Sequence, residues 1–362
     1  MIYVIVEWVQ LICLTFCIGI IVCRLWFFTP SMQTEFSYEG NFGAGLWKLF
    51  CFGLAFLIVG SVAGLIGRSV EMSGQPVSEI SSVLPRVLFK THYGTVWFVR
   101  IGALILLAIS KTVTLYRDRR TFLVFMFVLA LAVSMTASAS GHGADTGDFS
   151  IPEIMDWLHL IAACLWGGGL MVLAFSVLPD LIGQGKGSQP LISGVAGRFS
   201  TMAGVAVAVI VITAVYNFLL DVGSVRPMVE TPYGLTVAAK IFLLLILLNF
   251  GAFNRYVSVP LLQEWAGTSA EGRGVITRIA IRFFPMLQLE GNGGKVASRF
   301  MRSVKVEAVL IVGLLLCAAL LRHEVPARHL HHMGHADGKP MHMHQGEGGP
   351  PAAPEHPKHE GN

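Results

Sequence analysis

The stretch Asp156–Ile161 has the sequence Asp-Trp-Leu-His-Leu-Ile and opens an apolar block that continues to Leu178. The stretch Glu7–Ile12 has the sequence Glu-Trp-Val-Gln-Leu-Ile and opens another apolar block 149 residues earlier. Both follow the order acid, Trp, apolar, polar, Leu, Ile. Because about 20 mostly apolar residues suffice to cross a bilayer as a helix, the two stretches predict two equivalent membrane spans.

Two further matches extend this repeat along the chain. Thr91–Gly94 (Thr-His-Tyr-Gly) precedes one apolar block, and Thr231–Gly234 (Thr-Pro-Tyr-Gly) precedes another block 140 residues later. A basic residue follows each glycine by six positions, Arg100 in the first case and Lys240 in the second. We therefore expect two related units of four spans. An even number of spans makes both units run in the same direction, as in the parallel repeats of transporters.

The composition indicates a membrane protein rather than a soluble enzyme. Of the 362 residues, 54% are hydrophobic and 13% are charged, whereas soluble domains carry about 25% charged residues. The net charge of +4 is too small to suggest a nucleic-acid partner. The sequence contains no GxxxxGK[ST] nucleotide-binding loop. We expect a lipid bilayer as the surrounding medium, no nucleic-acid binding and no enzymatic activity.

The predicted fold class is all-α, a polytopic membrane helix bundle with eight transmembrane helices. The helices form two parallel four-helix repeats, residues 1–140 and 141–322. A tail over residues 323–362 is rich in Gly, Pro and His and is expected to be disordered. The predicted spans lie near Tyr3–Phe28, Leu46–Gly67, Thr95–Leu115, Thr121–Ser140, Ile154–Leu178, Thr201–Leu220, Val237–Phe253 and Val304–Leu321.

The distribution of basic residues predicts the orientation in the membrane. Of the 26 Lys and Arg residues, sixteen fall on one side of the predicted spans, the tail being counted with the other side. Cytoplasmic loops carry the excess of Lys and Arg, so this side is expected to be cytoplasmic. Both termini are then expected to be periplasmic.

Several ionisable side chains are predicted to meet near the outer ends of the spans. Asp156 and His159 are three residues apart, and Glu7 holds the place of Asp156 in the first unit. Arg100 and Lys240 lie at a similar depth in their spans, counted from the same side of the membrane. Ionisable groups inside a membrane face a partner or a cavity. A neutral imidazole beside a carboxylate is also a good metal ligand. Ion pairing that only fixes the helices is the alternative interpretation.

A group of His and Met residues flanks the same outer region and forms a candidate metal site. Met135 and His142 lie on one side of a short loop, Met155 and His159 lie on the other side, and His92 opens the third span. Thioether sulfur suits Cu(I), and imidazole suits Cu(II), Ni(II) and Zn(II). Packing is the alternative role for the methionines.

The tail is a second candidate metal-binding region. His-rich tracts are typical of metal binding, and the interleaved Met residues favour copper of either valence. A tail with only incidental metal affinity is the alternative. The candidate ligands of the tail are His329, His331, His332, His335, His342 and His344.

An ordered series of motifs runs through the second unit: Asp156–Leu160, Trp166–Gly169, Arg198–Ser200, Thr231–Gly234, Lys240 and Asn254–Arg255. In this series the chain resembles the copper resistance protein D (CopD/PcoD-like) family of eight-span inner-membrane proteins, over about Ile154–Leu262. The first unit matches only loosely. The resemblance implies copper handling at the bacterial inner membrane, with Cu(I) or Cu(II) as the bound or transported ion. It also implies a periplasmic copper-binding partner of the CopC type.

The leading hypothesis is copper transport or copper resistance, with His159 as the intramembrane ligand and Asp156 orienting its ring. One alternative is a membrane redox protein with b-type haem, which needs two axial ligands, usually histidines. The other is a membrane-anchored periplasmic metal buffer that works through the tail. Cys13 and Cys17 are four residues apart in an apolar block, and a soft-metal role for them stays open.

Overall fold

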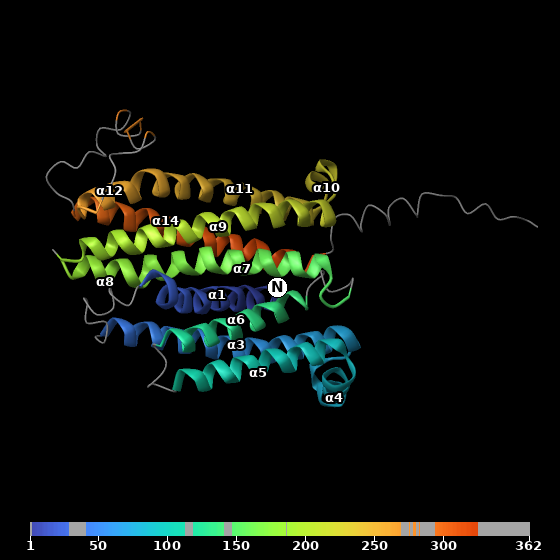
Figure 1. The fold of residues 1–362 in the computed structure, drawn as a ribbon. Helices are drawn as coiled ribbons and strands as arrows, with labels where there is room; N and C mark the ends of the chain where they lie inside the picture. Colours follow the sequence, from blue (N-terminus) through green and yellow to red (C-terminus); the bar gives the residue numbers. More distant parts are fainter. Residues whose placement is uncertain are drawn as a thin grey trace, which may run out of the picture.

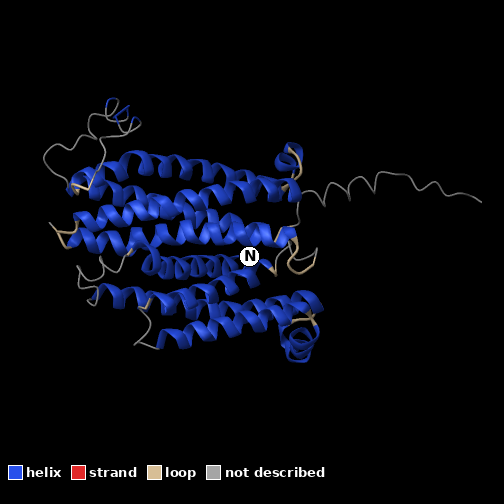
Figure 2. Cartoon of the chain, viewed as in Figure 1, coloured by secondary structure: helices blue, strands red, loops and turns tan. Residues whose placement is uncertain are grey.

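In the part of the chain that the structure describes, eight helices are long and apolar enough to cross a membrane, which confirms the predicted all-α bundle (Figures 1 and 2). The computed structural model describes residues 2–28, 41–112, 119–140, 147–185, 187–268, 294–324 and the single positions 275, 278, 279 and 282. The eight candidate spans are Ile2–Phe27, Gly45–Ser73, His92–Ser110, Arg120–Ser138, Ile151–Gly183, Gln189–Asp221, Pro232–Trp265 and Lys295–Leu321.

Most of these spans are single helices in the described residues. Short helices connect spans at one end of the bundle: α4 (Ile80–Lys90), which follows the turn η2 (Val77–Glu79), and α10 (Val225–Glu230). The long single helices are α3 (Asn41–Ser73), α5 (His92–Thr112), α6 (Arg120–Ser138), α9 (Gln189–Asp221) and α14 (Gly294–Leu321).

The other spans contain a π-helical segment. The segments η1 and η4 begin 150 residues apart, at equivalent places in the two units. Such π-helical segments are frequent at functional sites. The composite spans are α1 (Ile2–Val22) with η1 (Cys23–Phe27); α7 (Ile151–Val172) with η4 (Leu173–Val177) and α8 (Leu178–Gly183); and α11 (Pro232–Phe253) with η5 (Asn254–Ser258) and α12 (Val259–Trp265).

Several helices are longer than the sequence predicted. The sixth span begins at Gln189 rather than near Thr201, and the eighth begins at Lys295 rather than near Val304. The seventh span continues to Trp265 rather than ending near Phe253. Hydropathy detects only the apolar part of a helix. Backbone hydrogen bonding continues the same helix through polar turns on either side of that part.

The two central helices are α1 and α7, which pack against each other along the middle of the bundle (Figure 1). In the first unit α1 packs on α3, and α5 packs on α6; in the second unit α7 packs on α9, and α11 packs on α14. The units also exchange contacts, because α6 packs on α7 and α14 packs on α1. Each of these contacts therefore has a counterpart in the other unit, as expected for two parallel four-helix repeats.

Small residues permit the close contact between α1 and α7. A Cβ atom on Gly168 would overlap the carbonyl oxygen of Thr15, and one on Gly19 would overlap the backbone of Gly168. The hydroxyl of Thr15 also lies 3.5 Å from the sulfur of Cys164. Gly19 and Gly168, like Thr15 and Cys164, are 149 residues apart. The two central helices therefore meet at equivalent positions, where small residues let their backbones touch.

The repeated Thr-x-Tyr-Gly motifs form equivalent corners of the fold. The hydroxyl of Thr91 accepts a hydrogen bond from the backbone N–H of Gly94 at 3.2 Å, and that of Thr231 does the same for Gly234 at 3.0 Å. These are N-caps of α5 and α11. A Cβ atom on either glycine would overlap the backbone of the short helix before it. The motif therefore sets a tight turn between a short helix and a spanning helix in each unit.

The outer surface of the spans is apolar. Phe52, Val205, Ile212 and Phe242 are each about two-thirds exposed, at 64–66%. Large side chains of this kind are normally buried in a water-soluble protein. Their exposure along eight apolar helices is consistent with a surface that contacts lipid.

Candidate metal site at one end of the bundle

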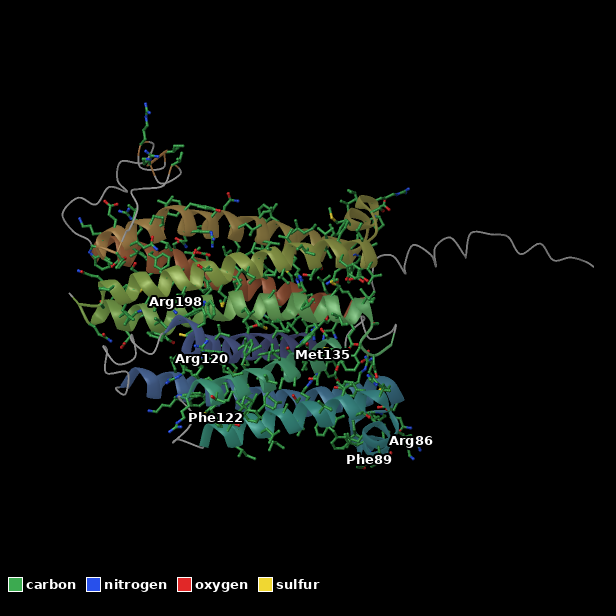
Figure 3. The ribbon with its side chains drawn as sticks, viewed as in Figure 1. Arg86, Phe89, Arg120, Phe122, Met135 and Arg198 are labelled. Atoms are coloured by element: carbon green, nitrogen blue, oxygen red, sulfur yellow. The ribbon has the colours of Figure 1, made fainter. Side chains whose placement is uncertain are left out.

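The ionisable side chains that were predicted to meet lie toward the end of the bundle that carries α4 and α10. In Figure 3 Met135 lies toward this end, whereas Arg120 and Arg198 lie toward the opposite end. We use the name polar cluster for the ionisable residues gathered here from five spans: Glu7, Arg100, Asp156, His159, Lys240 and Arg322.

An ion pair joins α1 to the end of α14 within the polar cluster. Arg322 Nη1 donates to Glu7 Oε1 at 2.7 Å, and the two side chains are only 23% and 25% exposed. Burial lowers the pKa of Arg322, but the carboxylates of Glu7 and Asp156 outweigh this effect and raise the pKa above its usual value. Arg322 therefore stays charged and neutralises the acid that the sequence places at the start of the first span.

Arg100 links α5 to α6. Its Nε donates to the hydroxyl of Thr136 at 3.0 Å, and its Nη2 donates to the carbonyl of Thr136 at 2.6 Å and the hydroxyl of Ser140 at 3.1 Å. A guanidinium with three hydrogen bonds to one neighbouring helix is well satisfied. This arrangement agrees with the interpretation in which Arg100 fixes helices.

Asp156 lies between several charges of the polar cluster. Its Oδ2 accepts a hydrogen bond of 2.6 Å from the hydroxyl of Ser138 on α6. Lys240 on α11, which is half-buried, lies within electrostatic range of both Asp156 and Arg322. Two basic side chains therefore lie near Asp156, as expected for an acid inside a membrane.

His159 lies inside the bundle and bonds to α9. Its Nδ1 is 2.9 Å from the hydroxyl oxygen of Thr213, a residue that is 1% exposed. The Thr213 hydroxyl itself donates to the carbonyl of Val209 at 2.7 Å. Because the carbonyls of Val209 and Ile210 both lie within bonding distance of this hydroxyl, we infer that its proton is on a carbonyl and that its oxygen accepts from Nδ1–H. The lone pair of the neutral imidazole is then on Nε2, the arrangement in which histidine binds a metal.

The bonding partner of the imidazole differs from the one expected. Asp156 was expected to orient the ring because it is three residues away on the same helix face. In the structure Thr213 bonds to Nδ1 and Asp156 is engaged by Ser138. Helical spacing fixes which side chains share a face, but the packing of α7 against α9 decides which group meets the ring.

The first unit holds a different residue at the place of His159. Gln10 Nε2 donates to the carbonyl of Gly60 on α3 at 3.0 Å. The helix α3 corresponds to α9, so Gln10 and His159 contact equivalent neighbours. The two units therefore share one framework, but only the second offers an imidazole.

The tryptophans beside these residues obey the same symmetry. Trp8 Nε1 donates to the carbonyl of Val312 on α14 at 3.0 Å, and Trp157 Nε1 donates to the hydroxyl of Ser134 on α6 at 3.0 Å. Each indole thus bonds to the last helix of the other unit. These bonds fix the rotation of α1 and α7, and with it the direction in which Gln10 and His159 project.

The other predicted metal ligands that the structure describes do not form a group around His159. His92 lies at an exposed position, with Nε2 at 3.3 Å from Asp148 Oδ1. Met135 and Met155 are half-buried on α6 and α7, and Trp166 is a core residue at 4% exposure. Within the described ranges no three His, Cys, Asp or Glu side chains form a group that could hold a metal ion.

Some predicted ligands lie outside the described residues. They are His142, which lies between α6 and α7 in the sequence, and the tail residues His329, His331, His332, His335, His342 and His344. Cys13 and Cys17 are described, and both thiols are free. The Cys17 sulfur lies 3.8 Å from the carbonyl of Phe50, so it packs between α1 and α3.

Sequence reasoning missed several residues that shape this region. Thr213 and Ser138 look like ordinary small polar residues of a membrane helix, and no sequence signal distinguishes them. Arg322 directly follows the last apolar block, and its sequence position does not indicate Glu7 as its partner. Glu307 had a visible signal, because it is an isolated acid within an apolar block.

The fold and the polar cluster define a helical membrane protein of two four-span repeats with charged groups gathered at one end. The profile described as copper resistance protein D-like, N-terminal domain, matches residues 1–150, and that described as copper resistance protein D matches residues 193–321. Together they cover well over half of the sequence. The chain belongs to the copper resistance protein D family.

Individual relatives agree with this assignment. The chain is 28% identical over 275 residues to copper resistance protein D of Pseudomonas syringae pv. tomato, covering 74% of this chain and 81% of the relative. It is 29% identical over 195 residues to copper transport protein CutJ of Bacillus subtilis, covering 49% of this chain and 35% of the relative. It is 26% identical over 181 residues to inner membrane protein YebZ of Escherichia coli, covering 49% and 59%. No solved structure matches the chain.

Proposed function

We propose that this chain is a copper transport or copper resistance protein of the bacterial inner membrane, and that it acts without catalysing a reaction. Relatives named for copper resistance and copper transport support the substrate. The relative named as an inner membrane protein supports the location. Copper, as Cu(I) or Cu(II), is then the bound or transported ion.

The observation that carries the proposal is the state of His159. The Thr213 hydroxyl lies 2.9 Å from Nδ1 of His159, and we infer that it donates to a backbone carbonyl and accepts from Nδ1. This leaves Nε2 as a metal-binding nitrogen within a membrane-spanning helix. Met155 lies four residues before His159 on the same face of α7 and is the soft donor that would join it in a copper site.

The polar cluster would then lie on the periplasmic side, together with both termini. This orientation rests on the excess of Lys and Arg at the opposite end of the spans. Copper would reach His159 from the periplasm, collected by the His and Met residues of the tail or delivered by a periplasmic protein of the CopC type.

Cellular copper measurements test the proposal. Cells that express the wild type, His159→Gln or the matched control Gln10→Ala at equal membrane levels are loaded with copper and analysed for total copper. We expect the wild type and Gln10→Ala to differ from the empty vector, and His159→Gln to match it. A rise above the vector would mean uptake, and a fall would mean export. Identical copper in all four strains would refute the proposal.

Deletion of residues 328–362 separates transport from buffering. If the bundle moves copper, the deletion lowers the copper flux at limiting copper and leaves the flux at saturating copper unchanged. Loss of copper tolerance with an unchanged flux at both concentrations would instead identify a membrane-anchored metal buffer.

A further inference from the structure

A second polar site lies inside the bundle, away from the polar cluster. Glu307 is located in the middle of the last span, 12 residues after Lys295 and 14 before Leu321. Its side chain is only 2% exposed. It is the single acidic residue of that span. An intramembrane acid is costly and is by default a functional candidate.

The neighbours of Glu307 form a small hydrogen-bonded network. The Asn254 side-chain amide donates to Glu307 Oε1 and, at 3.0 Å, to the hydroxyl of Ser303. The hydroxyl of Ser258 donates to Asn254 Oδ1 at 2.9 Å. Asn254 and Ser258 are 7% and 8% exposed. The network therefore lies in the interior of the bundle and not on its lipid-facing surface.

The backbone around the network is irregular. Asn254 and Ser258 are the first and last residues of the π-helical segment η5, between α11 and α12. A π-helical turn inserts one residue into a helix and is common at functional sites. Here it presents Asn254 to Glu307, so the irregular segment and the buried acid belong to one site.

No charged group compensates Glu307 in the described part of the chain. Apart from its burial, Asn254 is the group that acts on its carboxyl. The charged side chains of α1, α7 and α11 lie nearer the polar cluster. The other charged groups are Asp180, Arg255 and Glu264 on the elements packed around α14, and Lys295, Arg299, Arg302 and Lys305 on α14 itself. None of them pairs with Glu307.

An ionised carboxylate buried without a cation would be strongly unfavourable, so the acid takes up a proton instead. A metal cation would need several oxygen ligands around it. The network instead directs the N–H group of Asn254 at Glu307, which suits a carboxyl group that binds and releases a proton. We propose that Glu307 is a proton-binding site, and that its proton is released and rebound as copper moves through the bundle.

The second part of this proposal rests on the proposed copper transport, whereas the first part does not. The first unit contains no equivalent acid, because α6 (Arg120–Ser138) has no Asp or Glu. His159 is likewise replaced by Gln10 in the first unit. The second unit therefore holds both the candidate copper ligand and the candidate proton site.

Infrared spectroscopy of the purified full chain in lipid nanodiscs tests proton binding. Glu307→Gln is compared with the wild type and with Glu153→Gln, which removes an acid that is also 2% exposed but caps the start of α7, where Phe149 N–H donates to it. We expect the carbonyl band of a protonated carboxylic acid at pH 7 in the wild type and Glu153→Gln, and its loss in Glu307→Gln. An equal band in all three, or its absence from the wild type, would overturn the proposal. Loss of the wild-type band when sodium replaces potassium at constant pH would identify a sodium site instead.

Proteoliposomes with a trapped pH indicator test the coupling. Copper added outside should change the internal pH with the wild type and Glu153→Gln, and change it at least tenfold more slowly with Glu307→Gln. Glu307→Asp should restore part of the rate, which separates the loss of the acid from misfolding. Copper entry by the wild type without a pH change would overturn the coupling. If the wild type moves no copper, the proposed function fails, and the infrared band still decides whether Glu307 binds a proton.

Discussion

A neutral hydroxyl, rather than a charge, holds the candidate copper ligand of this protein. Thr213 is buried, and its bond to His159 needs no compensating ion in the membrane interior. The charged side chains nearby instead neutralise one another, as Glu7 does with Arg322. The polar cluster therefore separates two tasks, since charge pairing stabilises the bundle and Thr213 prepares His159 for a metal.

Replacing Thr213 tests this division of roles. Thr213→Val keeps the shape of the side chain and removes the hydroxyl, so the imidazole loses the acceptor that fixes its tautomer. We expect copper affinity to fall roughly 10–100-fold, the usual effect of losing a partner behind a metal ligand. Copper competition titrations on purified protein measure it. Thr213→Ser keeps the hydroxyl and should bind as the wild type does; equal affinities of Val and Ser variants would contradict the assignment.

The ion pair between Glu7 and Arg322 should contribute to stability. Arg322→Gln leaves the Glu7 carboxylate mostly buried without its partner, which costs roughly 1–3 kcal/mol. Thermal or denaturant unfolding in detergent measures the change. Because removing both charges leaves neither uncompensated, Glu7→Gln with Arg322→Gln should be less destabilised than the sum of the single variants. Strict additivity would show that the pair contributes little.

At the scale of elements, the fold depends on how closely α1 and α7 approach. Each of these helices donates an indole hydrogen bond to the last helix of the other unit, α1 through Trp8 and α7 through Trp157. Their own contact is made by Gly19 and Gly168, where the backbones touch. The direction in which His159 projects therefore follows from this helix crossing.

A methyl group at the crossing should separate the two helices. In Gly168→Ala the new Cβ meets the Thr15 carbonyl, and overpacking of this kind costs typically 1–3 kcal/mol. Unfolding measurements in detergent should show that loss. Gly102→Ala on α5 is the matched control, because no atom lies within 4 Å of its new Cβ. It should be neutral or slightly stabilising. An unchanged unfolding stability of Gly168→Ala would mean that α1 and α7 can move apart at this crossing without loss of stability.

For the whole molecule, the parallel repeat makes both units enter the membrane from the same side. The two proposed sites nevertheless lie in one unit, because Gln10 holds the place of His159 in the first unit and α6 contains no acid. A duplicated framework with a single site suggests that the first unit mainly supports the second. The orientation of the bundle then decides which compartment the polar cluster faces.

Thiol labelling tests that orientation. Gln75 and Gln184 are exposed and lie in turns at opposite ends of the spans. We expect a membrane-impermeant maleimide to label Gln75→Cys in intact spheroplasts and to label Gln184→Cys only after permeabilisation. The six native cysteines all lie in spans and provide the background control. The reverse pattern would place the polar cluster in the cytoplasm.

The sequence by itself determined the eight spans, the internal repeat and the family. These features depend on local composition and on short ordered motifs, such as Asp156–Ile161 and Thr231–Gly234, which can be recognised without knowing any contact. It also placed Glu7, Arg100, Asp156, His159 and Lys240 at a similar depth, because each lies a short, countable distance from the same ends of the spans.

Only the tertiary structure decided which of these groups bond. Thr213 is 54 residues from His159, Arg322 is 315 residues from Glu7, and the amide that meets Glu307 is 53 residues away. Depth along a helix can be counted from the sequence. The rotation of each helix about its own axis is set by packing, here by the Gly19–Gly168 crossing and the indole bonds. That rotation is why the partners of the candidate site could not be predicted.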